Sequence, residues 1–82
     1  DPPLERIVAL RGSVKARGAL ARLYYAVRRH HDAERTAAAV VADHPESGEG
    51  LDVLGLARIA LEDYEGAIEP LERWVRLRPA DL

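Results

Sequence analysis

The sequence contains no cysteine, no methionine and no phenylalanine, and aromatic residues make up only 5% of it. Without cysteine, the chain cannot form disulfide bonds, thiolate metal sites or a cysteine nucleophile. No apolar run approaches the ~20 residues that a transmembrane helix needs, and no charged-then-apolar leader opens the chain. Strand signals are also missing, because apolar and polar residues nowhere alternate between turn dipeptides. We therefore expect an all-α protein without membrane insertion.

The composition fits one small globular domain, residues 1–82, with 48% hydrophobic and 32% charged residues. Alanine, leucine, arginine and glutamate dominate, and all four favour helix. The missing initial methionine and the Asp1-Pro2-Pro3 opening suggest an excised or processed piece. We expect a cytoplasmic location, with the periplasm as the alternative, because a cysteine-free chain suits both. The preference for arginine over lysine suggests a bacterial, GC-rich source.

The net charge of −2 is unevenly distributed along the chain. Residues 1–41 carry eight basic and four acidic side chains, a balance of +4, whereas residues 42–82 carry four basic and ten acidic, a balance of −6. Such a chain offers one half to acidic partners and the other half to basic ones. Ordinary solvated helix faces are the alternative explanation. Nucleic-acid binding is not expected, because the net charge is negative and no aromatic-basic platform is present.

Apolar spacing and turn residues predict about five helices, over residues 3–11, 14–29, 33–43, 51–61 and 64–78. Ser13 is expected to cap the second helix and Asp63 the fifth. The turn before the third helix is assigned to the two histidines at 30–31, with Asp32 as its N-cap. Pro70 lies inside the last helix, where we expect a bend and no break.

Three of these helices carry an apolar stripe that predicts their buried face. The stripes are Leu20, Leu23, Tyr24 and Val27; Ala33, Ala37, Val40 and Val41; and Ala67, Ile68, Leu71, Trp74 and Val75.

The chain repeats itself with a 34-residue period. The shift aligns Leu20 with Leu54, Ala26 with Ala60, Ala33 with Ala67, Val41 with Val75 and Pro45 with Pro79. A 34-residue unit of two helices, with a small residue at their crossing and proline at the exit, resembles the tetratricopeptide repeat (TPR). The second unit fits well through Leu54-Gly55, Ala67, Leu71 and Pro79, although Arg58 replaces the usual tyrosine. The first unit is degenerate, because Arg17 stands at the tryptophan position.

The resemblance implies a short right-handed α-solenoid of antiparallel helix hairpins. Residues 14–47 are the first repeat and residues 48–81 the second. Residues 3–12 form a partial N-terminal repeat or a capping helix, because "PLERIVALR" parallels "PLERWVRLR" at 70–78. Independently of the family, small residues at Ala33, Gly55 and Ala67 allow close helix crossings, and each hairpin leaves an apolar face for a neighbour to cover.

Nothing in the sequence predicts an enzyme, a cofactor or a metal site. The two serines, Ser13 and Ser47, stand at helix caps, and no phosphate-binding glycine loop is present. His44 lies roughly 18 Å along the helix from the histidine pair at 30–31, so one metal ion cannot use all three. Water-exposed turn histidines are the simpler interpretation.

The resemblance implies instead a non-catalytic protein–protein interaction module, a scaffold or adaptor whose concave groove binds a peptide or protein segment. The groove residues would be Lys15, Arg22, Tyr25 and Arg29 from the first repeat and Asp52, Leu56 and Ile59 from the second. The basic members suit an acidic segment, and the aliphatic pair suits an apolar side chain. The lysine/asparagine set of chaperone-tail-binding repeats is absent. Ordinary solubility is the alternative explanation of the basic stripe.

Trp74 has three interpretations: a cap over the open end of the array, an anchor inserted into another chain, or a core residue. Two and a fraction repeats are fewer than the three that usually give independent stability. We therefore expect self-association, head-to-tail or through the Trp74 end, or membership of a longer array. The alternative function is an accessory domain of a larger bacterial enzyme or secretion machine.

Overall fold

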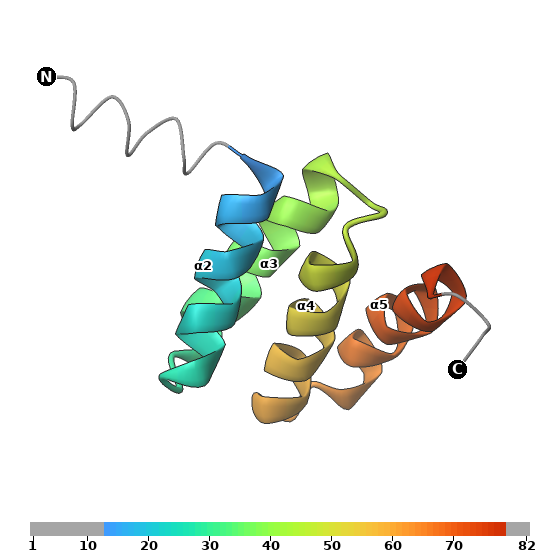
Figure 1. Ribbon diagram of the computed structural model, residues 1–82. Coiled ribbons are helices and arrows are strands. Elements are labelled where there is room, and N and C mark those ends of the chain that lie inside the picture. Colours follow the sequence, from blue (N-terminus) through green and yellow to red (C-terminus); the bar gives the residue numbers. More distant parts are fainter. Residues whose placement is uncertain (1–12, 79–82) are drawn as a thin grey trace, which may run out of the picture.

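The structure is a computed structural model, and it describes residues 13–78. Within this range the chain forms four helices and no strand: α2 (Val14–Ala26), α3 (His30–Asp43), α4 (Gly48–Ala60) and α5 (Tyr64–Leu77). The all-α prediction is confirmed for this part of the chain (Figure 1). The helix expected over residues 3–11 lies outside the described residues.

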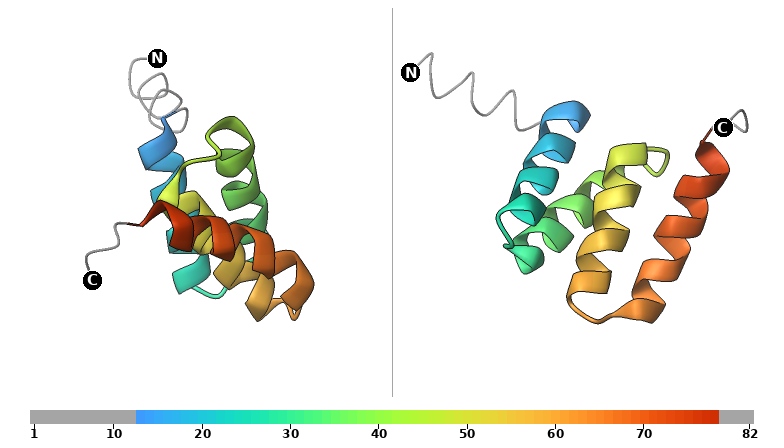
Figure 2. Two further views of the ribbon diagram at one scale, coloured as in Figure 1. Left: turned by 90° about the vertical axis from the view of Figure 1, so that its right-hand side faces the viewer. Right: turned by 60° about the horizontal axis from the view of Figure 1, so that its bottom comes forward.

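The four helices form two hairpins that lie side by side. The first hairpin pairs α2 with α3, the second pairs α4 with α5, and α4 also packs against α3 and α2. The central position of α4 between the first hairpin and α5 is visible in both figures (Figures 1 and 2). α4 is accordingly the helix with the most buried residues, whereas α5 has one long side unmatched by another described helix.

The 34-residue period is present in the backbone itself. The bounds of α2 and α3, moved by one period, are the bounds of α4 and α5. The caps repeat as well: Ser13 Oγ accepts from the Ala16 amide at 3.0 Å, and Ser47 Oγ accepts from the Gly50 amide at 3.1 Å. Each serine satisfies a backbone donor that the first helical turn leaves without a partner. The predicted capping by Ser13 is thereby confirmed.

The turns within the two hairpins also match. Arg28 and Glu62, which the repeat aligns with each other, adopt left-handed backbone conformations with φ of 66° and 65°. The Arg29 amide donates to the Tyr24 carbonyl at 2.8 Å, and the Asp63 amide donates in the same way to Arg58 at 2.8 Å. A hydrogen bond that spans six residues in this way ends a helix, and the left-handed residue beside it is usually glycine. Here two charged residues occupy the left-handed position instead.

The predicted turn between α2 and α3 was wrong in detail. α2 ends at Ala26 and not near 29, because the left-handed Arg28 turns the chain earlier. His30 and His31 are therefore the first residues of α3, and Asp32 lies in its first turn. The N-cap is Arg29, which makes no side-chain capping bond. Asp32 binds two arginines instead of capping.

The second hairpin lies closer to the prediction. α4 begins at Gly48, three residues earlier than expected, because Ser47 caps it. Asp63 caps α5 as predicted, accepting from the Gly66 amide at 3.0 Å. α5 runs through Pro70 without a break, and the buried proline ring lies within the packed face.

The core lies where α3, α4 and α2 meet. Its buried hydrophobic residues are Ala21, Ala33, Ala37, Val40, Leu51, Val53, Leu54, Ala57 and Ala67. The α3 stripe is confirmed, since three of its four members are fully buried. The other two stripes were partly wrong. Leu23 of α2, its C-cap Val27, and Ile68 and Val75 of α5 are each more than half exposed. They lie on the outer sides of the two hairpins, whereas α3 is covered by α4.

Gly55 allows α4 and α5 to approach closely. A Cβ atom at this position would lie 2.3 Å from both Cγ and Cδ2 of Leu71. The leucine therefore fills the volume that any larger residue at 55 would need. The corresponding pair of the first hairpin is Ala21 and Ala37, both fully buried. The helix crossing is thus filled by two small residues in the first hairpin, and by a glycine and a leucine in the second.

Candidate interaction surface

Six of the seven predicted groove residues lie on the first helix of one of the two hairpins. Lys15, Arg22 and Tyr25 lie on α2, and three further residues lie on α4: Asp52, Leu56 and Ile59. Arg29 lies in the turn between α2 and α3, outside both of these helices. Leu56 is half-buried and Ile59 is 40% exposed. The two aliphatic side chains thus remain accessible to a partner.

Arg22 joins the two hairpins and is not a free cation. Its Nε atom donates to Glu49 at 2.7 Å, and its Nη2 atom donates to Asp52 at 2.8 Å. The hydrogen bond to Asp52, followed by the bond to Glu49, raises the pKa of Arg22 above its already high ordinary value. Arg22 and Asp52, both predicted to face a partner, therefore neutralise each other across the α2–α4 contact.

Arg29 is also engaged within the chain. Its Nε atom donates to Asp32 at 2.8 Å, and Arg35 donates to the other oxygen of the same carboxylate. The bond from Arg35, supported by Arg29, lowers the pKa of Asp32 below its ordinary value of 3.8. The Arg29 guanidinium also lies 5.4 Å from the centre of the Tyr24 ring, a cation–π arrangement.

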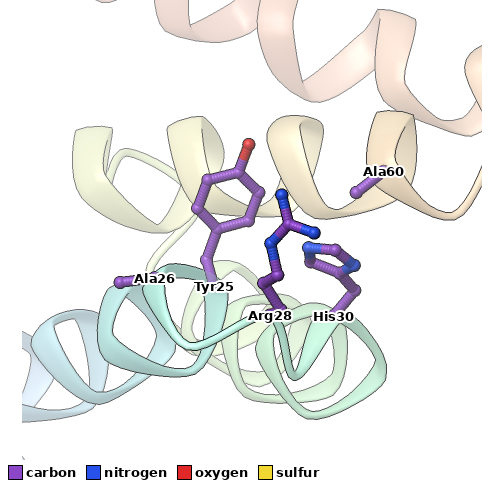
Figure 3. Close-up of a pocket in the computed structure, with 5 residues that line it drawn as sticks. All are labelled: Tyr25, Ala26, Arg28, His30 and Ala60. Carbon is purple, nitrogen blue, oxygen red and sulfur yellow. The ribbon is translucent and has the colours of Figure 1, made fainter.

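A hollow of about 500 Å³ lies where the α2–α3 turn approaches the end of α4, lined by Tyr25, Ala26, Arg28, His30 and Ala60. Figure 3 shows the side chains of Tyr25, Arg28 and His30 extending side by side toward the helix that carries Ala60. The Tyr25 and His30 rings lie 5.6 Å apart at 49°. Among residues 13–78, no hydrogen bond or ion pair engages the Arg28 guanidinium, the His30 ring nitrogens or the Tyr25 hydroxyl. Three donors thus converge on one hollow.

Sequence reasoning found Tyr25 but missed Arg28 and His30. Arg28 was placed inside the helix predicted over residues 14–29 and His30 in the turn after it, because nothing in "AVRRHHD" indicates which of the two arginines takes the left-handed conformation. A signal was present in the repeat: the glycine that usually ends such a helix is missing in both units. An arginine held in that conformation is fixed at the rim of the hollow.

Trp74 packs inside its own chain. The half-buried indole lies against Gly48, where an added Cβ would be 3.7 Å from Cδ1 and Nε1 of the ring. The Arg78 guanidinium lies over the ring, 4.6 Å from its centre. Trp74 therefore joins α5 to the start of α4, and part of the ring remains accessible.

The contact between the hairpins is closed by an ion pair at the position where the TPR pattern has tyrosine. Arg58 of α4 donates to Glu34 of α3 from Nε at 3.2 Å and from Nη2 at 3.1 Å. Its Nη1 atom donates to the Gly66 carbonyl at 2.9 Å. Because Arg58 thus holds α3, α4 and α5 together, the departure from the pattern has a structural function here.

Two kinds of site receive no support within residues 13–78. No group of three or more histidine, aspartate or glutamate side chains is arranged to hold a metal ion there. In the same range, no helix has the length and apolar character required to cross a bilayer.

Comparison with known proteins identified no relative of this chain. A scan against protein-family models found no matching family. Searches of curated proteins and of solved structures also returned no significant match. The resemblance to the TPR therefore remains a prediction carried by the residues and the 34-residue period.

Proposed function

We propose that this chain is a non-catalytic protein–protein interaction module, a short right-handed solenoid of TPR type. Its ligand is an acidic peptide or protein segment that lies along the α2–α4 groove. An acidic side chain or terminal carboxylate of the ligand enters the hollow bounded by Tyr25, Arg28 and His30. A neighbouring apolar side chain of the ligand rests on Leu56 and Ile59.

The observation that carries this proposal is the set of three unengaged donors around the hollow. Most other arginines of the described chain, among them Arg17, Arg22, Arg29, Arg35, Arg58 and Arg73, already hold carboxylates. Arg28 does not, and it stands beside an imidazole and a phenol. A carboxylate is the ligand that accepts hydrogen bonds from all three groups, and its bond to a guanidinium is charge-assisted. We therefore assign anion recognition to Arg28, and a structural role to Arg22.

The turn geometry allows a sharp test with the variant Arg28→Gly. Glycine removes the guanidinium and at the same time relieves the left-handed backbone, so the fold is expected to gain stability. We expect an acidic peptide to bind about tenfold more weakly to this variant, the loss of one charge-assisted hydrogen bond. Fluorescence anisotropy of labelled acidic peptides, with amidated sequences for comparison, measures the change.

Glu62→Gly is the matched control, because Glu62 holds the same backbone conformation in the other hairpin. This variant should stabilise the fold without weakening the binding of the acidic peptide. Equal binding by the wild type and Arg28→Gly, or equal weakening by both glycine variants, would contradict the proposal. Tyr25→Phe, which removes only the hydroxyl, should produce a smaller loss than Arg28→Gly.

A further inference from the structure

We propose that the outer face of α5 binds the outer face of α2 in a second copy of this chain, so that copies stack head-to-tail. The apolar residues of this second surface are different from those of the groove, and they serve assembly instead of ligand recognition. The occupant is a copy because both complementary faces are present on one chain, at positions that the internal repeat relates to each other.

The α5 face is apolar and bare in the described structure. It consists of Ile68, Leu71 and Val75, and its outer two members are 54% and 62% exposed. A hollow of about 380 Å³ lies over Leu71 and Val75, with Glu72 and Arg76 completing its lining. On α3 the equivalent of Leu71 is Ala37, which is fully buried under α4, and the equivalent of Val75 is Val41, which is half-buried. The same helix face is therefore covered in one hairpin and open in the other.

The outer face of α2 is exposed, whereas the equivalent face of α4 is buried. Leu23 of α2 is 57% exposed, whereas Ala57, its equivalent in α4, is fully buried against the first hairpin. Val27 is 56% exposed on the same side. Each exposed face thus corresponds to one half of a contact that the chain already makes once internally.

The residue pairs at this contact change together. Suppose that a copy packs on α5 in the way that the second hairpin packs on the first. Each contacting residue is then replaced by the residue one repeat away. The Glu34–Arg58 ion pair then becomes Ile68 against Tyr24 of the copy. Had only one of the two positions become apolar, a charge would be buried without a partner, at considerable cost. At this pair both positions have lost their charge, so the copies can meet here without leaving a charge unpaired.

The exposed hairpin turns add charge complementarity. The first turn carries Arg28, Arg29 and Arg35 against two acids, one of which Arg58 neutralises. The equivalent stretch of the second hairpin, residues 62–69, carries four acids and no base. In a head-to-tail stack the acidic turn of one copy lies next to the basic turn of the following copy, as it does within the chain. This alternation favours encounter in one orientation.

Two single variants test the proposal on the full chain. Val75→Glu places a charge on the α5 face, and Leu23→Glu places one on the α2 face. Both positions are more than half exposed, so circular dichroism should report an unchanged helix content. Sedimentation velocity of the wild type should give a mean mass that rises beyond the dimer between about 10 µM and about 1 mM. Each variant alone should remain monomeric.

Mixing the two variants distinguishes the modes of association. Val75→Glu retains a working α2 face, and Leu23→Glu retains a working α5 face, so the mixture should form one dimer and grow no further. If two α5 faces met each other instead, Leu23→Glu would still dimerise and mixing would add nothing, which overturns the head-to-tail arrangement. A wild type that stays monomeric throughout the range overturns self-association itself.

Ile59→Glu is the matched control on a different face, because Ile59 is an exposed aliphatic residue of the groove. It should leave the mass distribution unchanged. Conversely, Val75→Glu should bind acidic peptides as the wild type does. Failure of stacking and failure of groove binding therefore produce separate results.

Discussion

The close crossing of α4 and α5 predicts that the effect of Gly55→Ala on the free energy of unfolding changes sign when Leu71 is replaced by alanine. Gly55→Ala introduces a Cβ that would lie 2.3 Å from Leu71 Cγ, a separation that atoms in folded proteins do not tolerate. Because Cγ lies near the root of the leucine side chain, a rotation of its tip cannot relieve the contact. Overpacking of this kind costs about 1–3 kcal/mol.

A helix gains about 1 kcal/mol when an internal glycine becomes alanine. In the wild type the two effects oppose each other, and we expect Gly55→Ala to lower the free energy of unfolding by about 1 kcal/mol. In the Leu71→Ala background the obstacle is gone, and the same change should raise it by about 1 kcal/mol. The coupling between the two positions is thus about 2 kcal/mol.

Urea denaturation measures all four members of this cycle, with Trp74 fluorescence reporting on α5 and circular dichroism on the helices. For a domain of this size about 1 kcal/mol corresponds to a midpoint shift of about 1 M urea. Ala21→Gly is the control in the first hairpin, and it should cost about 1 kcal/mol. If Gly55→Ala had the same sign in both backgrounds, the close approach of α4 to Leu71 would be refuted.

Three further predictions concern caps, turns and pH. Ser47→Ala removes the bond to the Gly50 amide and should cost about 1 kcal/mol, seen as a melting temperature lower by about 4–8 °C. Glu62→Gly relieves a left-handed residue and should gain about 1 kcal/mol; an unchanged melting temperature would contradict the strained turn. Asp32→Asn should destabilise at neutral pH only. The lowered pKa of Asp32 gives the wild type stability that is present above about pH 4 and is lost as the pH falls through the folded-state pKa. Melting curves of both proteins should therefore converge once the pH falls below the folded-state pKa of Asp32; a constant difference would argue against the paired carboxylate.

The periodic features were predictable from sequence because they are local. The 34-residue shift, the caps at Ser13, Ser47 and Asp63 and the buried stripe of α3 all follow from residue spacing along single helices. The end of α2 was missed because a left-handed arginine has no composition signal, and glycine is the residue that marks such a turn. The histidines were consequently placed one element too early.

The groove charges depend on contacts between hairpins, which spacing does not reveal. In the sequence Arg22 looks like a free cation, but in the stacked hairpins it lies opposite Glu49 and Asp52 and binds both. The exposure of Val75 was missed for a related reason: an apolar stripe predicts a face that needs covering, and says nothing about which neighbour covers it.

The ion pair between Glu34 and Arg58 also limits how such a chain can be lengthened. If the second hairpin were duplicated directly after itself, Ile68 would meet another Arg58, and that guanidinium would lose its carboxylate. Adding both hairpins together as one block avoids this mismatch, because the first hairpin brings Tyr24 to the new seam. Insertion of a single hairpin and insertion of a hairpin pair should therefore differ in outcome, although both preserve the helical period.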